Sequence, residues 1–404
     1  MSLRRLISRA RLTVLGLNSG TSADGLDLAV VQVGRGREKI LMRGGGAVRF
    51  PRPLRAAILA TADSRTVEPA ELVRLDNYLG QVMGRAAAGF LKTLSRRGIA
   101  VDLIGSHGQT VRHVPEPVRM GGMAVRGTLQ IGSPDQVAAA TGCVTVGDFR
   151  QAEVALGGEG APITTGAMHW LFASPREPRL IVNIGGIANY FYLPPTASGE
   201  APTARDCGPG NSLSDALMAR SFGRQFDRDG RMARRGRIDP RLLAALMESL
   251  GFARRRRSTG RELFGADLAD EVVRLGRRRR LRPEDLLATA GELTALGIAR
   301  ALHRLPASDP PPRRVYLMGG GRHNQFMVER LGEHLPGWSV EAIDQLGVDG
   351  DLVEAAAYAV MAAACVRGEP LSGARTFGVA RAIAGRIVQP PAGCRMIDRD
   401  NLRI

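Results

Sequence analysis

The first third of the chain alternates short apolar runs with polar turns, and this pattern predicts β-strands. Val14–Leu17 and Leu26–Val33 are two such runs, joined by a turn rich in Gly, Ser and Asp, and Ala47–Phe50 is a third candidate strand. Between Leu72 and Phe90 the apolar residues recur as on one face of a helix, which predicts a long amphipathic helix. A short apolar strand then precedes a polar loop.

The same pattern returns about half a chain later. Leu180–Ile184 is an apolar strand, a glycine turn follows, and Asn189–Leu193 is the returning strand. Arg314–Met318 is a further strand that enters a glycine triplet, and helical spacing follows over Gln325–Leu335 and Leu352–Ala364. Two hairpins of one type at this separation favour a duplicated α/β lobe over a single doubly wound sheet.

Length and charge limit the class of protein. The chain has 404 residues and is 44% hydrophobic, which is enough to build two lobes. Its formal net charge of +17 raises the question of a nucleic-acid partner, and two tight arginine clusters stand at Arg254–Arg257 and Arg277–Arg280. A surface that binds nucleic acid is expected to interleave aromatic residues, and these clusters have almost none. We interpret them as solvated surface and expect no nucleic-acid partner.

Cysteine usage and apolar segments bear on the compartment. Cys143, Cys207, Cys365 and Cys394 are widely scattered and form no CxxC pair, which predicts reduced thiols rather than disulfides or a zinc site. No stretch approaches the length of a membrane span, and the apolar run after the Arg-rich segment Met1–Arg11 is too short for a signal peptide. An organellar presequence is less favoured for that segment than a plain basic extension. We expect a cytoplasmic protein with no membrane partner.

Residues suited to chemistry gather in the turn between the first two predicted strands. Glycines let the backbone approach an anion, and backbone N–H groups with Thr and Ser hydroxyls can grip phosphate oxygens. Asp24 or Asp27 could hold Mg²⁺, directly or through water, because this ion prefers oxygen ligands. The alternative is a polar hairpin turn that needs Gly and Asp for backbone reasons alone. The candidate cofactor-binding residues here are Gly20, Thr21, Ser22, Asp24, Gly25 and Asp27.

Two further glycine turns follow predicted strands. One lies in Asn183–Asn189, and the other is the triplet Gly319–Gly321 between a strand and a helix. Bare backbone at a helix start can accept a nucleotide, although a lone glycine triplet is common. The pattern GxxxxGK[ST] is absent, which excludes a P-loop enzyme. The candidate cofactor-binding residues of these turns are Asn183, Gly185, Gly186, Gly319, Gly320 and Gly321.

Asp206 is a lone carboxylate in a Gly- and Pro-rich segment before a helix expected near Ser212. A carboxylate with fixed geometry that stays ionised is what a general base requires. The alternative is a helix-entry turn in which Asp206 only forms the turn and Asn211 caps the helix. Hydrogen-bonding groups suited to sugar hydroxyls also gather in the polar loop Ser106–His113, although a loop histidine is more often structural than catalytic.

Taken together, these segments closely resemble the anhydro-N-acetylmuramic acid kinases, bacterial enzymes of peptidoglycan recycling. The resemblance covers nearly the whole chain, and its specificity comes from the ordered series rather than from any one segment. The matching segments are GLNSGTSADGLD (Gly16–Asp27), GSHGQTVRHVPE (Gly105–Glu116), LQIGSPDQVAAATG (Leu129–Gly142), GDFRQAEVALGGEGAP (Gly147–Pro162), VNIGGIANYFYL (Val182–Leu193), DCGPGNSLSDAL (Asp206–Leu217), STGRELF (Ser258–Phe264), MGGGRHN (Met318–Asn324) and DQLGVDGDLVEAAAYA (Asp344–Ala359).

The resemblance implies a two-lobed actin-like ATPase fold of duplicated ribonuclease H-like domains, with ATP in the cleft between the lobes. Lobe I would comprise residues 1–135 and about 368–404, and lobe II residues 136–367. Gly20–Asp27 would be the first phosphate loop and Asn183–Asn189 the second, and Gly319–Gly321 would lie at the adenosine. A homodimer is a further implication.

The implied reaction converts 1,6-anhydro-N-acetylmuramic acid, ATP and water to N-acetylmuramate 6-phosphate and ADP. Asp206 matches the aspartate that activates the water opening the anhydro bridge at C1, while the freed O6 takes the γ-phosphoryl group. The candidate substrate-binding residues are His107, Gln109, Thr110, Arg150 and Asn211.

The chain departs from the family pattern at several positions. Ala23 replaces a larger apolar residue, Cys207 a threonine, Ser133 an aspartate, Glu159 a glutamine, and Gly265 an asparagine. These departures leave three hypotheses: the anhydromuramate kinase, a kinase of the same architecture for another amino sugar, and a nucleotide- or nucleic-acid-binding protein without kinase activity. The retained Asp206 and phosphate turns argue against the third.

Overall fold

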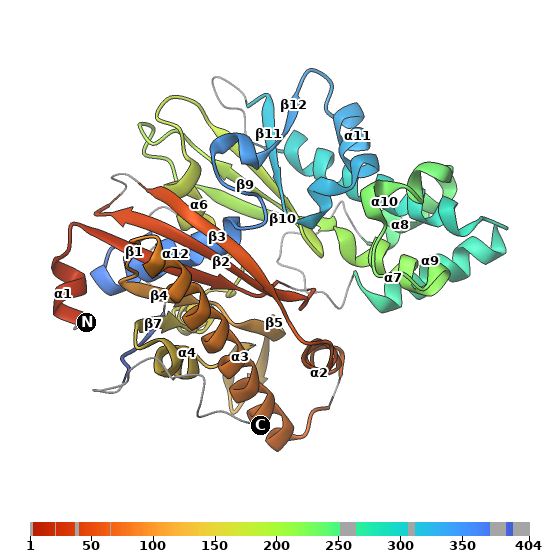
Figure 1. Cartoon of the computed structure of the whole chain (residues 1–404). Coiled ribbons are helices and arrows are strands. Elements are labelled where there is room, and N and C mark those ends of the chain that lie inside the picture. The colour runs from red at the N-terminus through yellow and green to blue at the C-terminus, as the bar shows by residue number, and fades with distance from the viewer. Residues whose placement is uncertain are drawn as a thin grey trace. The chain divides into compact units, whose positions relative to one another are not determined.

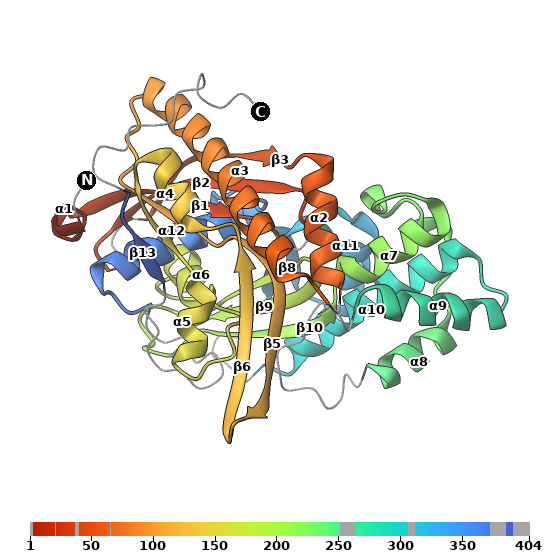
Figure 2. The same ribbon diagram turned by 90° about the horizontal axis from the view of Figure 1, so that it is seen from below.

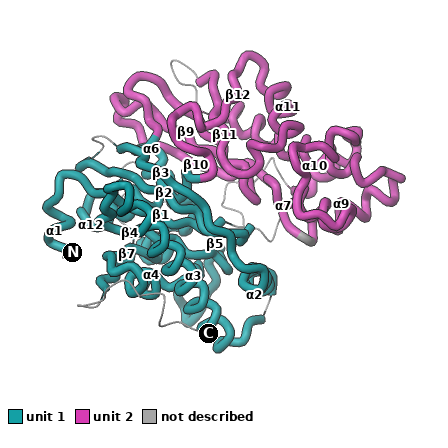
Figure 3. Tube along the Cα trace, in the orientation of Figure 1, with its two compact units in different colours: residues 1–171, 352–404 teal, residues 172–351 magenta. Residues whose placement is uncertain are grey.

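The structure is a computed structural model that contains two compact units, residues 1–171 with 352–404 and residues 172–351 (Figure 3). The described residues are 3–20, 22–36, 40–64, 66–250, 264–305, 312–371 and 385–390. Several residues named in the sequence analysis lie outside the described residues: Thr21, the cluster Arg254–Arg257, residues 258–263, and Cys394.

The first unit is built on one mixed sheet (Figure 1). Its first three strands form an antiparallel meander, the next two run parallel to the first strand, and a short last strand adds antiparallel at the edge. In spatial order the strands are β13 (Arg386–Val388), β7 (Val144–Gly147), β4 (Leu103–Ser106), β1 (Arg11–Asn18), β2 (Gly25–Gly34) and β3 (Leu41–Arg49).

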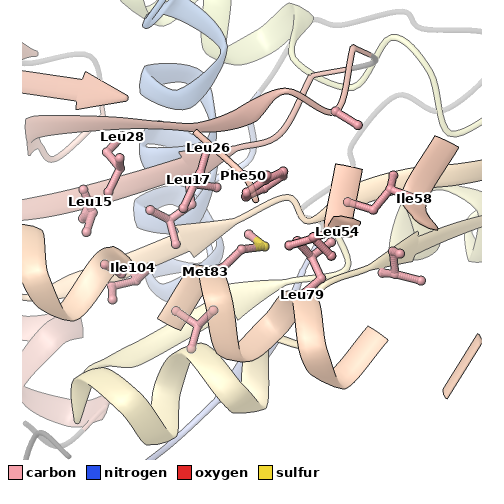
Figure 4. Packing of buried hydrophobic residues seen from close by; sticks show 14 of the residues in the cluster. Leu15, Leu17, Leu26, Leu28, Phe50, Leu54, Ile58, Leu79, Met83 and Ile104 are labelled. Carbon is pink, nitrogen blue, oxygen red and sulfur yellow. The ribbon is translucent and has the colours of Figure 1, made fainter. Parts of the chain in front are cut away.

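One face of this sheet carries the main hydrophobic core of the unit. Leu15 and Leu17 of β1 alternate with residues of the other face and pack against Leu79 and Met83 of α3 (Pro69–Arg96), as Figure 4 shows. These side chains are fully buried, and burying a Leu or Met contributes about 1.5–3 kcal/mol. The predicted long helix is confirmed, and it extends beyond the predicted range at both ends.

The opposite face of the sheet receives α12 (Val353–Arg367) at very short range. A Cβ on Gly16 of β1 would lie 1.8 Å from the Ala355 carbonyl oxygen, and one on Gly105 of β4 would lie 2.3 Å from that of Tyr358. Gly16 and Gly105 are register partners, so the bare backbone forms a seat two strands wide for this alanine-rich helix. The seat brings the start of α12 to the carboxyl ends of β1 and β4.

A two-stranded hairpin of β5 (Gln109–Met120) and β6 (Met123–Ile131) follows β4 and extends away from the sheet (Figure 2). The predicted polar loop over Ser106–His113 is therefore wrong beyond Gly108, because the chain turns at this residue (φ +72°) and pairs as a strand from Gln109 onward. The other helices of this unit are α1 (Leu3–Ser8), α2 (Arg52–Asp63), α4 (Pro134–Thr141), α5 (Phe149–Ala155) and α6 (Thr165–Phe172), the last of which ends at the unit boundary.

The second unit repeats the strand order of the first. Its first three strands form an antiparallel meander, and two further strands run parallel to the first of them. In spatial order they are β10 (Thr203–Pro209), β9 (Ile187–Leu193), β8 (Arg179–Ile184), β11 (Arg314–Met318) and β12 (Ser339–Ala342). Both sheets therefore share one arrangement. The first three strands form a meander, and the fourth and fifth strands run parallel to the first. This repetition confirms the predicted duplicated α/β fold.

Helices make up the rest of the second unit and have their own core. Leu213, Leu217, Leu246 and Leu286 are buried in a cluster separate from the one behind the sheet. The helices are α7 (Asn211–Phe222), α8 (Pro240–Ser249), α9 (Ala266–Arg278), α10 (Pro283–His303) and α11 (Gln325–His334), with 3₁₀ segments η1 (Arg228–Gly230), η2 (Ala233–Arg235), η4 (Gly320–His323) and η5 (Ile343–Leu346).

The units divide at 171/172 and 351/352, whereas the predicted lobe boundaries stood at 135/136 and about 367/368. The difference has a physical cause. Strand β7 hydrogen-bonds to β4 and so belongs to the first sheet, and α12 packs on the glycine seat of that sheet. A boundary set at residue 135 or 367 would separate these elements from the strands on which they lie.

Two composition-based expectations concern the surface and the cysteines. Residues Arg277–Arg280 are exposed at the end of α9, as predicted for solvated surface. Cys143, Cys207 and Cys365 are free thiols. Among the described helices, none combines the length and apolar character that a membrane span needs.

Candidate functional site

The first turn, between β1 and β2, is closed by its own groups. The Ser22 hydroxyl donates a 2.6 Å hydrogen bond to Asp24 Oδ1, and the Ala23 N–H donates to the Gly20 carbonyl over 3.0 Å. Ala23 has a positive φ of 49° and a fully buried methyl group. A larger side chain here would need both this positive φ and more space in the core. The small Ala23 meets both conditions, so this departure from the family pattern affects packing.

The two glycines of this turn differ in what explains them. A Cβ on Gly25 would lie 2.6 Å from the Val48 carbonyl oxygen, so the neighbouring β3 requires this glycine. A Cβ on Gly20 would meet no atom of the described residues within 4 Å, and the φ of Gly20 is not in the left-handed region. The fold therefore does not need glycine at position 20, whereas close approach of a phosphate would.

The two candidate metal-binding carboxylates lie in different environments. Asp24 is exposed in the turn, whereas Asp27 is half-buried within β2, directly across from Asn18 of β1. Opposed residues in an antiparallel pair point to the same face, which here is the face of α12, because Asn18 Nδ2 donates to Glu354 Oε2 over 3.1 Å. Mg²⁺ commonly keeps several waters and takes one or two carboxylates, so either residue offers the kind of oxygen ligand that this ion accepts. No cluster of three or more metal-ligating side chains occurs among the described residues.

His107 and Arg150 are directly hydrogen-bonded. Arg150 Nε donates to His107 Nε2 over 2.9 Å, and Arg150 Nη1 donates to the Gly160 carbonyl over 3.0 Å. Since a guanidinium N–H can only donate, His107 carries its proton on Nδ1 and donates it to the Gly108 carbonyl over 3.1 Å. Burial, and then the charge of Arg150, lower the pKa of His107 to about 3. His107 is thus a neutral imidazole that orients Arg150.

Two residues of α12 complete this group and were missed by sequence reasoning. The His107 ring stacks on Tyr358, with ring centroids 4.5 Å apart, and Glu354 lies one helical turn before Tyr358. Burial raises the pKa of Glu354, and the charge of Arg150 opposes that shift in part. The available signal was a carboxylate that opens an otherwise alanine-rich helix.

Gln109 connects the start of β5 to the end of β1. Its amide oxygen accepts a 2.6 Å hydrogen bond from the Ser19 hydroxyl, and both side chains are buried. Thr110, the next residue, accepts from Gln130 Nε2 across the hairpin over 3.2 Å. Gln109 is therefore tied to the residue before the first turn, whereas Thr110 is half-buried and bonded within the hairpin.

A polar pocket of about 220 Å³ opens at the carboxyl ends of β4 and β7. Two polar atoms of this pocket have no hydrogen-bond partner among the described residues: the hydroxyl of Ser106 and Oε1 of Gln130. Ser106 is only 2% exposed. Arg386 of β13 makes ion pairs of 2.7 Å with both Asp135 and Asp148 at its rim. The residues that line the pocket include Ser106, His107, Gln130, Ser133, Asp148 and Arg386.

A second acidic group lies beside Arg150. Glu153 is buried, and its Oε2, like Glu159 Oε2, has no hydrogen-bond partner among the described residues. Burial raises the pKa of Glu153 to about 7, while Arg150 lowers it and Glu159 raises it further. Burial and Arg150 lower the pKa of His113 to about 4. The position of Glu159 among these groups shows that its departure from the expected glutamine alters the charge around Arg150.

In the second unit, the turn after β8 is held by the start of α7. The Asn211 N–H donates to the Gly185 carbonyl (2.7 Å), and the Ser212 N–H donates to the Gly186 carbonyl (3.2 Å). The Asn211 side chain donates to the Ile184 carbonyl (3.0 Å), so it does not cap the helix, which begins after Gly210. The predicted helix start near Ser212 is confirmed, and the alternative role of Asn211 as a cap is not observed.

Asp206 lies within strand β10 rather than in the predicted Gly- and Pro-rich turn. It pairs in register with Asn189 of β9, which in turn pairs with Asn183 of β8. Opposed residues share a face, so these three polar side chains form one row across the sheet. The Oδ1 atom of Asn189 has no hydrogen-bond partner among the described residues. Sequence reasoning placed Asn189 at the edge of the second turn but did not select it.

The register is broken immediately after Asp206. A bulge lies between Asp206 and Gly208, and Cys207 at the bulge is buried. Burial, and then the charge of Asp206, raise the pKa of the Cys207 thiol, so it stays protonated at neutral pH. A bulge re-aims the side chains beside it, and bulges are frequent next to active sites. The strand and its bulge provide the fixed geometry for Asp206 that a turn was expected to supply.

The third glycine turn packs on the second. A Cβ on Gly319 (φ +77°) would lie 2.3 Å from Asn183 Oδ1, and one on Gly321 would lie 2.2 Å from Ile184 Cγ2. Packing therefore requires both of these glycines. A Cβ on Gly320 would make only an ordinary 3.7 Å contact with Asn211 Nδ2, so the fold leaves the glycine at this position unexplained.

The predicted site residues thus form one group in each unit. The first turn, His107, Gln109 and Arg150 lie at the carboxyl ends of β1 and β4 in the first unit. Asn183, Asp206 and the two glycine turns lie at the carboxyl ends of β8, β10 and β11 in the second unit. Ligands of open α/β sheets bind at this edge.

Comparisons with known proteins agree with the pattern of motifs. The family model described as "Anhydro-N-acetylmuramic acid kinase" matches residues 12–388. The chain is 38% identical over 372 residues to the protein of that name from Salinibacter ruber, covering 91% of this chain and 94% of that protein. It is 35% identical over 371 residues to the one from Caldanaerobacter subterraneus, covering 91% and 94%. A solved activator of 2-hydroxyisocaproyl-CoA dehydratase from Clostridium difficile is 12% identical, covering 88% of this chain and 96% of that one, with a TM-score of 0.41.

Proposed function

The chain belongs to the anhydro-N-acetylmuramic acid kinase family, and on that premise we propose that it phosphorylates 1,6-anhydro-N-acetylmuramic acid with ATP in peptidoglycan recycling. The family match over residues 12–388 carries this proposal. The products are N-acetylmuramic acid 6-phosphate and ADP. A water oxygen bonds to C1 of the sugar, the C1–O6 bond breaks, and O6 bonds to the γ-phosphorus as ADP leaves.

Asp206 is the general base in this proposal. It takes a proton from the water as the oxygen attacks C1, which leaves the electron pair of the broken C1–O6 bond on O6 for the phosphoryl group. Its place in the row with Asn189 and Asn183 supports this role, because the amide of Asn189 lies next to the carboxylate on a rigid sheet and Asn183 follows on the next strand. Positioned general bases typically contribute about 10²–10⁴-fold.

The glycine turns hold the nucleotide in this proposal. The first turn (Gly20, Ser22, Asp24, Gly25, Asp27, with Thr21) and Asn183, Gly185 and Gly186 would bind phosphates, and Gly319–Gly321 would meet the adenosine. The unexplained glycines at 20 and 320 support close ligand approach at both places. Asp24 and Asp27 would hold Mg²⁺, which supplies neutralisation of phosphate charge when bound.

The sugar is bound in this proposal by the polar groups of the first unit. Arg150, aligned by the neutral His107, donates to ring or carbonyl oxygens, and Gln109 and Thr110 add amide and hydroxyl groups. Asn211 would contribute from the start of α7. Among the described residues, the Ser106 hydroxyl and the Gln130 side-chain amide oxygen have no partner. Both line the polar pocket at the carboxyl ends of β4 and β7, which supports binding of a polar ligand there. The proposal also includes the cytoplasmic location expected from the sequence. It further includes the homodimer that the family resemblance implies.

A second candidate is a kinase of the same fold for a different amino sugar. Ser133 lines the pocket where the family has an aspartate, so this position offers a hydroxyl and no carboxylate. The Ser133 hydroxyl accepts a hydrogen bond from the Asp135 N–H and caps α4. Glu159, in place of a glutamine, adds an acidic group near Arg150. Both departures bear on which sugar fits.

An acceptor comparison tests the proposal. Purified protein with Mg²⁺–ATP is given the anhydro sugar, open-ring N-acetylmuramic acid or N-acetylglucosamine, and ADP release is followed. We expect kcat/KM for the anhydro sugar to exceed that for either open-ring sugar at least tenfold. A preference for an open-ring sugar would support the second candidate, and absence of ADP release with all three would contradict both.

A further inference from the structure

Arg322 is a largely buried charged side chain beside the third glycine turn. It lies in η4, immediately after Gly321, and its side chain is only 8% exposed. A buried guanidinium must be paired, because desolvating a charge without partners is costly. The Arg322 Nη1 group donates to the Gly319 carbonyl over 3.4 Å, and its guanidinium also forms ion pairs with three carboxylates.

Those carboxylates come from one short segment, residues 344–351, which ends the second unit. Arg322 makes ion pairs of 3.5 Å with both Asp344 and Asp349, and a shorter one with Asp351. Burial raises the pKa of Asp351, but the hydrogen bond with Arg322 and the charges of Arg322 and His323 together outweigh burial, and the pKa is lowered. The three acids are about half exposed, so the arginine, and not the acids, is the buried member of the group.

The segment is shaped around the arginine head. A Cβ on Gly350 would lie 2.7 Å from Arg322 Nε, and the Gly350 φ is not in the left-handed region. A side chain at 350 would therefore have to displace the guanidinium, whereas the backbone at this position does not call for glycine. The Gly350 N–H donates to Asp344 Oδ1 over 3.3 Å, which closes the segment on itself.

Gly319, which Arg322 contacts, has almost no freedom of its own. Its left-handed φ of 77° and its approach to Asn183 Oδ1 place it against the second turn. A triplet of glycines has no side chains to hold it, and glycine loses more conformational freedom on ordering than any other residue. The Arg322 backbone N–H donates to the Gly319 carbonyl over 3.1 Å, and the guanidinium adds a side-chain partner to the same carbonyl.

We infer that Arg322 is a positioning residue for nucleotide binding, which holds the Gly319–Gly321 turn in its ligand-ready form by anchoring it to the carboxylates of residues 344–351. This inference rests on the proposed function, since it assigns the turn to the nucleotide. Arg322 acts through Gly319 and need not touch the ligand. Its planar fork serves the carbonyl and several carboxylates together, which a lysine cannot do.

The direct test is the affinity for ADP with Mg²⁺, measured by calorimetry in the full-length protein. For Arg322→Lys we expect the Kd for ADP to rise about tenfold, the KM for ATP to rise in step, and the KM for the sugar to stay within twofold of wild type. Arg330→Lys is the matched control, because Arg330 makes a comparable ion pair with Glu292 (2.6 Å) in the same unit, away from the glycine turn. Its Kd for ADP should be unchanged.

Gly350→Ala is a second probe that removes no charge. The added methyl group should displace the guanidinium and raise the Kd for ADP severalfold, with no added effect in an Arg322→Lys background, because both changes act through one group. If Arg322→Lys fails to fold, Gly350→Ala decides alone. Unchanged ADP affinity in every folded variant, with wild type binding ADP, would overturn the inference. Failure of wild type to bind ADP would overturn the proposed function instead.

Discussion

The hydroxyl of Ser19 donates a 2.6 Å hydrogen bond to the amide oxygen of Gln109, and both side chains are buried. This bond joins the residue before Gly20, in the first glycine turn, to the strand that begins at Gln109. Because Gln109 follows Ser19 by 90 residues, the contact exists only in the folded first unit. It fixes the relative position of two elements that the proposed reaction needs on one ligand.

Removing one partner of this bond should destabilise the protein. Ser19→Ala leaves Gln109 Oε1 buried without a donor, which costs about 1–3 kcal/mol in the free energy of unfolding. Ser22→Ala is the control, because its hydrogen bond to Asp24 is exposed and its loss should cost less than 1 kcal/mol, roughly the worth of a typical net hydrogen bond. Chemical denaturation of both variants measures the difference. Equal stability of the two would show that the Ser19–Gln109 bond does not hold these elements together.

Asp206→Asn should fold normally and lose most turnover. The substitution keeps the shape of the side chain in β10 but removes the base, so kcat should fall by about 10²–10⁴-fold. Thermal melting should give a midpoint close to wild type, since Asp206 is half-buried at the sheet edge. A loss of less than tenfold would remove Asp206 from the role of base.

Asn189→Ala should lower turnover through Asp206. Asn189 is the register partner of Asp206, and its Oδ1 has no hydrogen-bond partner among the described residues. If the amide orients the base, we expect kcat to fall about tenfold, which corresponds to a loss of about 1.4 kcal/mol in transition-state stabilisation, while the KM for ATP changes little. In Asp206→Asn, the same change should have no further effect. Additive losses in the double variant would indicate that Asn189 acts independently.

Asp24→Asn should weaken the use of Mg²⁺ with ATP. Loss of one oxygen ligand should raise the Mg²⁺ concentration needed for half-maximal activity, with a smaller change at saturating metal. The same titration of Asp27→Asn shows which carboxylate contributes more. Metal dependence that matches wild type in both variants would reduce the first turn to a structural hairpin.

Glu153 predicts a stability that falls as pH rises. Its pKa is about 7 in the folded protein and near the ordinary value of 4.5 when unfolded. Between these values the folded state binds more protons than the unfolded state, so stability decreases from about pH 4.5 to 7. Glu153→Gln should therefore be more stable than wild type at pH 8, by about 1–3 kcal/mol in the free energy of unfolding, and should melt at a higher temperature. At pH 4 the two proteins should melt at similar temperatures. An equal effect at both pH values would exclude ionisation of Glu153 as the cause.

His107 has the opposite dependence. Its pKa of about 3 lies below the ordinary 6.5, so the unfolded state binds the extra proton as pH falls. The stability linked to His107 is present above pH 6.5 and is lost between 6.5 and 3. His107→Asn should flatten this acid limb of the stability curve, which a pH series of thermal melts would show.

Local patterns predicted the elements with local causes. The alternation over β1 and β2, the apolar stripe of α3 and the strands β8 and β11 are each encoded within a few turns of chain. The duplication was visible because the two hairpins repeat the same order. Strand β5 was missed because its first two residues, Gln109 and Thr110, are polar and its later residues are mostly exposed.

The contacts that build the site could not be predicted in the same way. Asn18 and Glu354 are separated by 336 residues, and no periodicity relates them. The pairing of His107 with Arg150 depends on how β4 and α5 meet, and the row of Asp206 with Asn189 depends on the register of β10. The resemblance to a family selected most of these segments, but the geometry around Glu354 and Arg322 needed the folded chain.

The central claim is that phosphorylation is coupled to opening of the anhydro ring, and mass spectrometry of the product tests it most directly. Purified protein is incubated with Mg²⁺–ATP and 1,6-anhydro-N-acetylmuramic acid in ¹⁸O-labelled water. The account predicts a product heavier than the substrate by one phosphoryl group and one water, with the label on the sugar at C1 and none in the phosphate. A phosphorylated product without the added water, or with the label only in free phosphate, would contradict it.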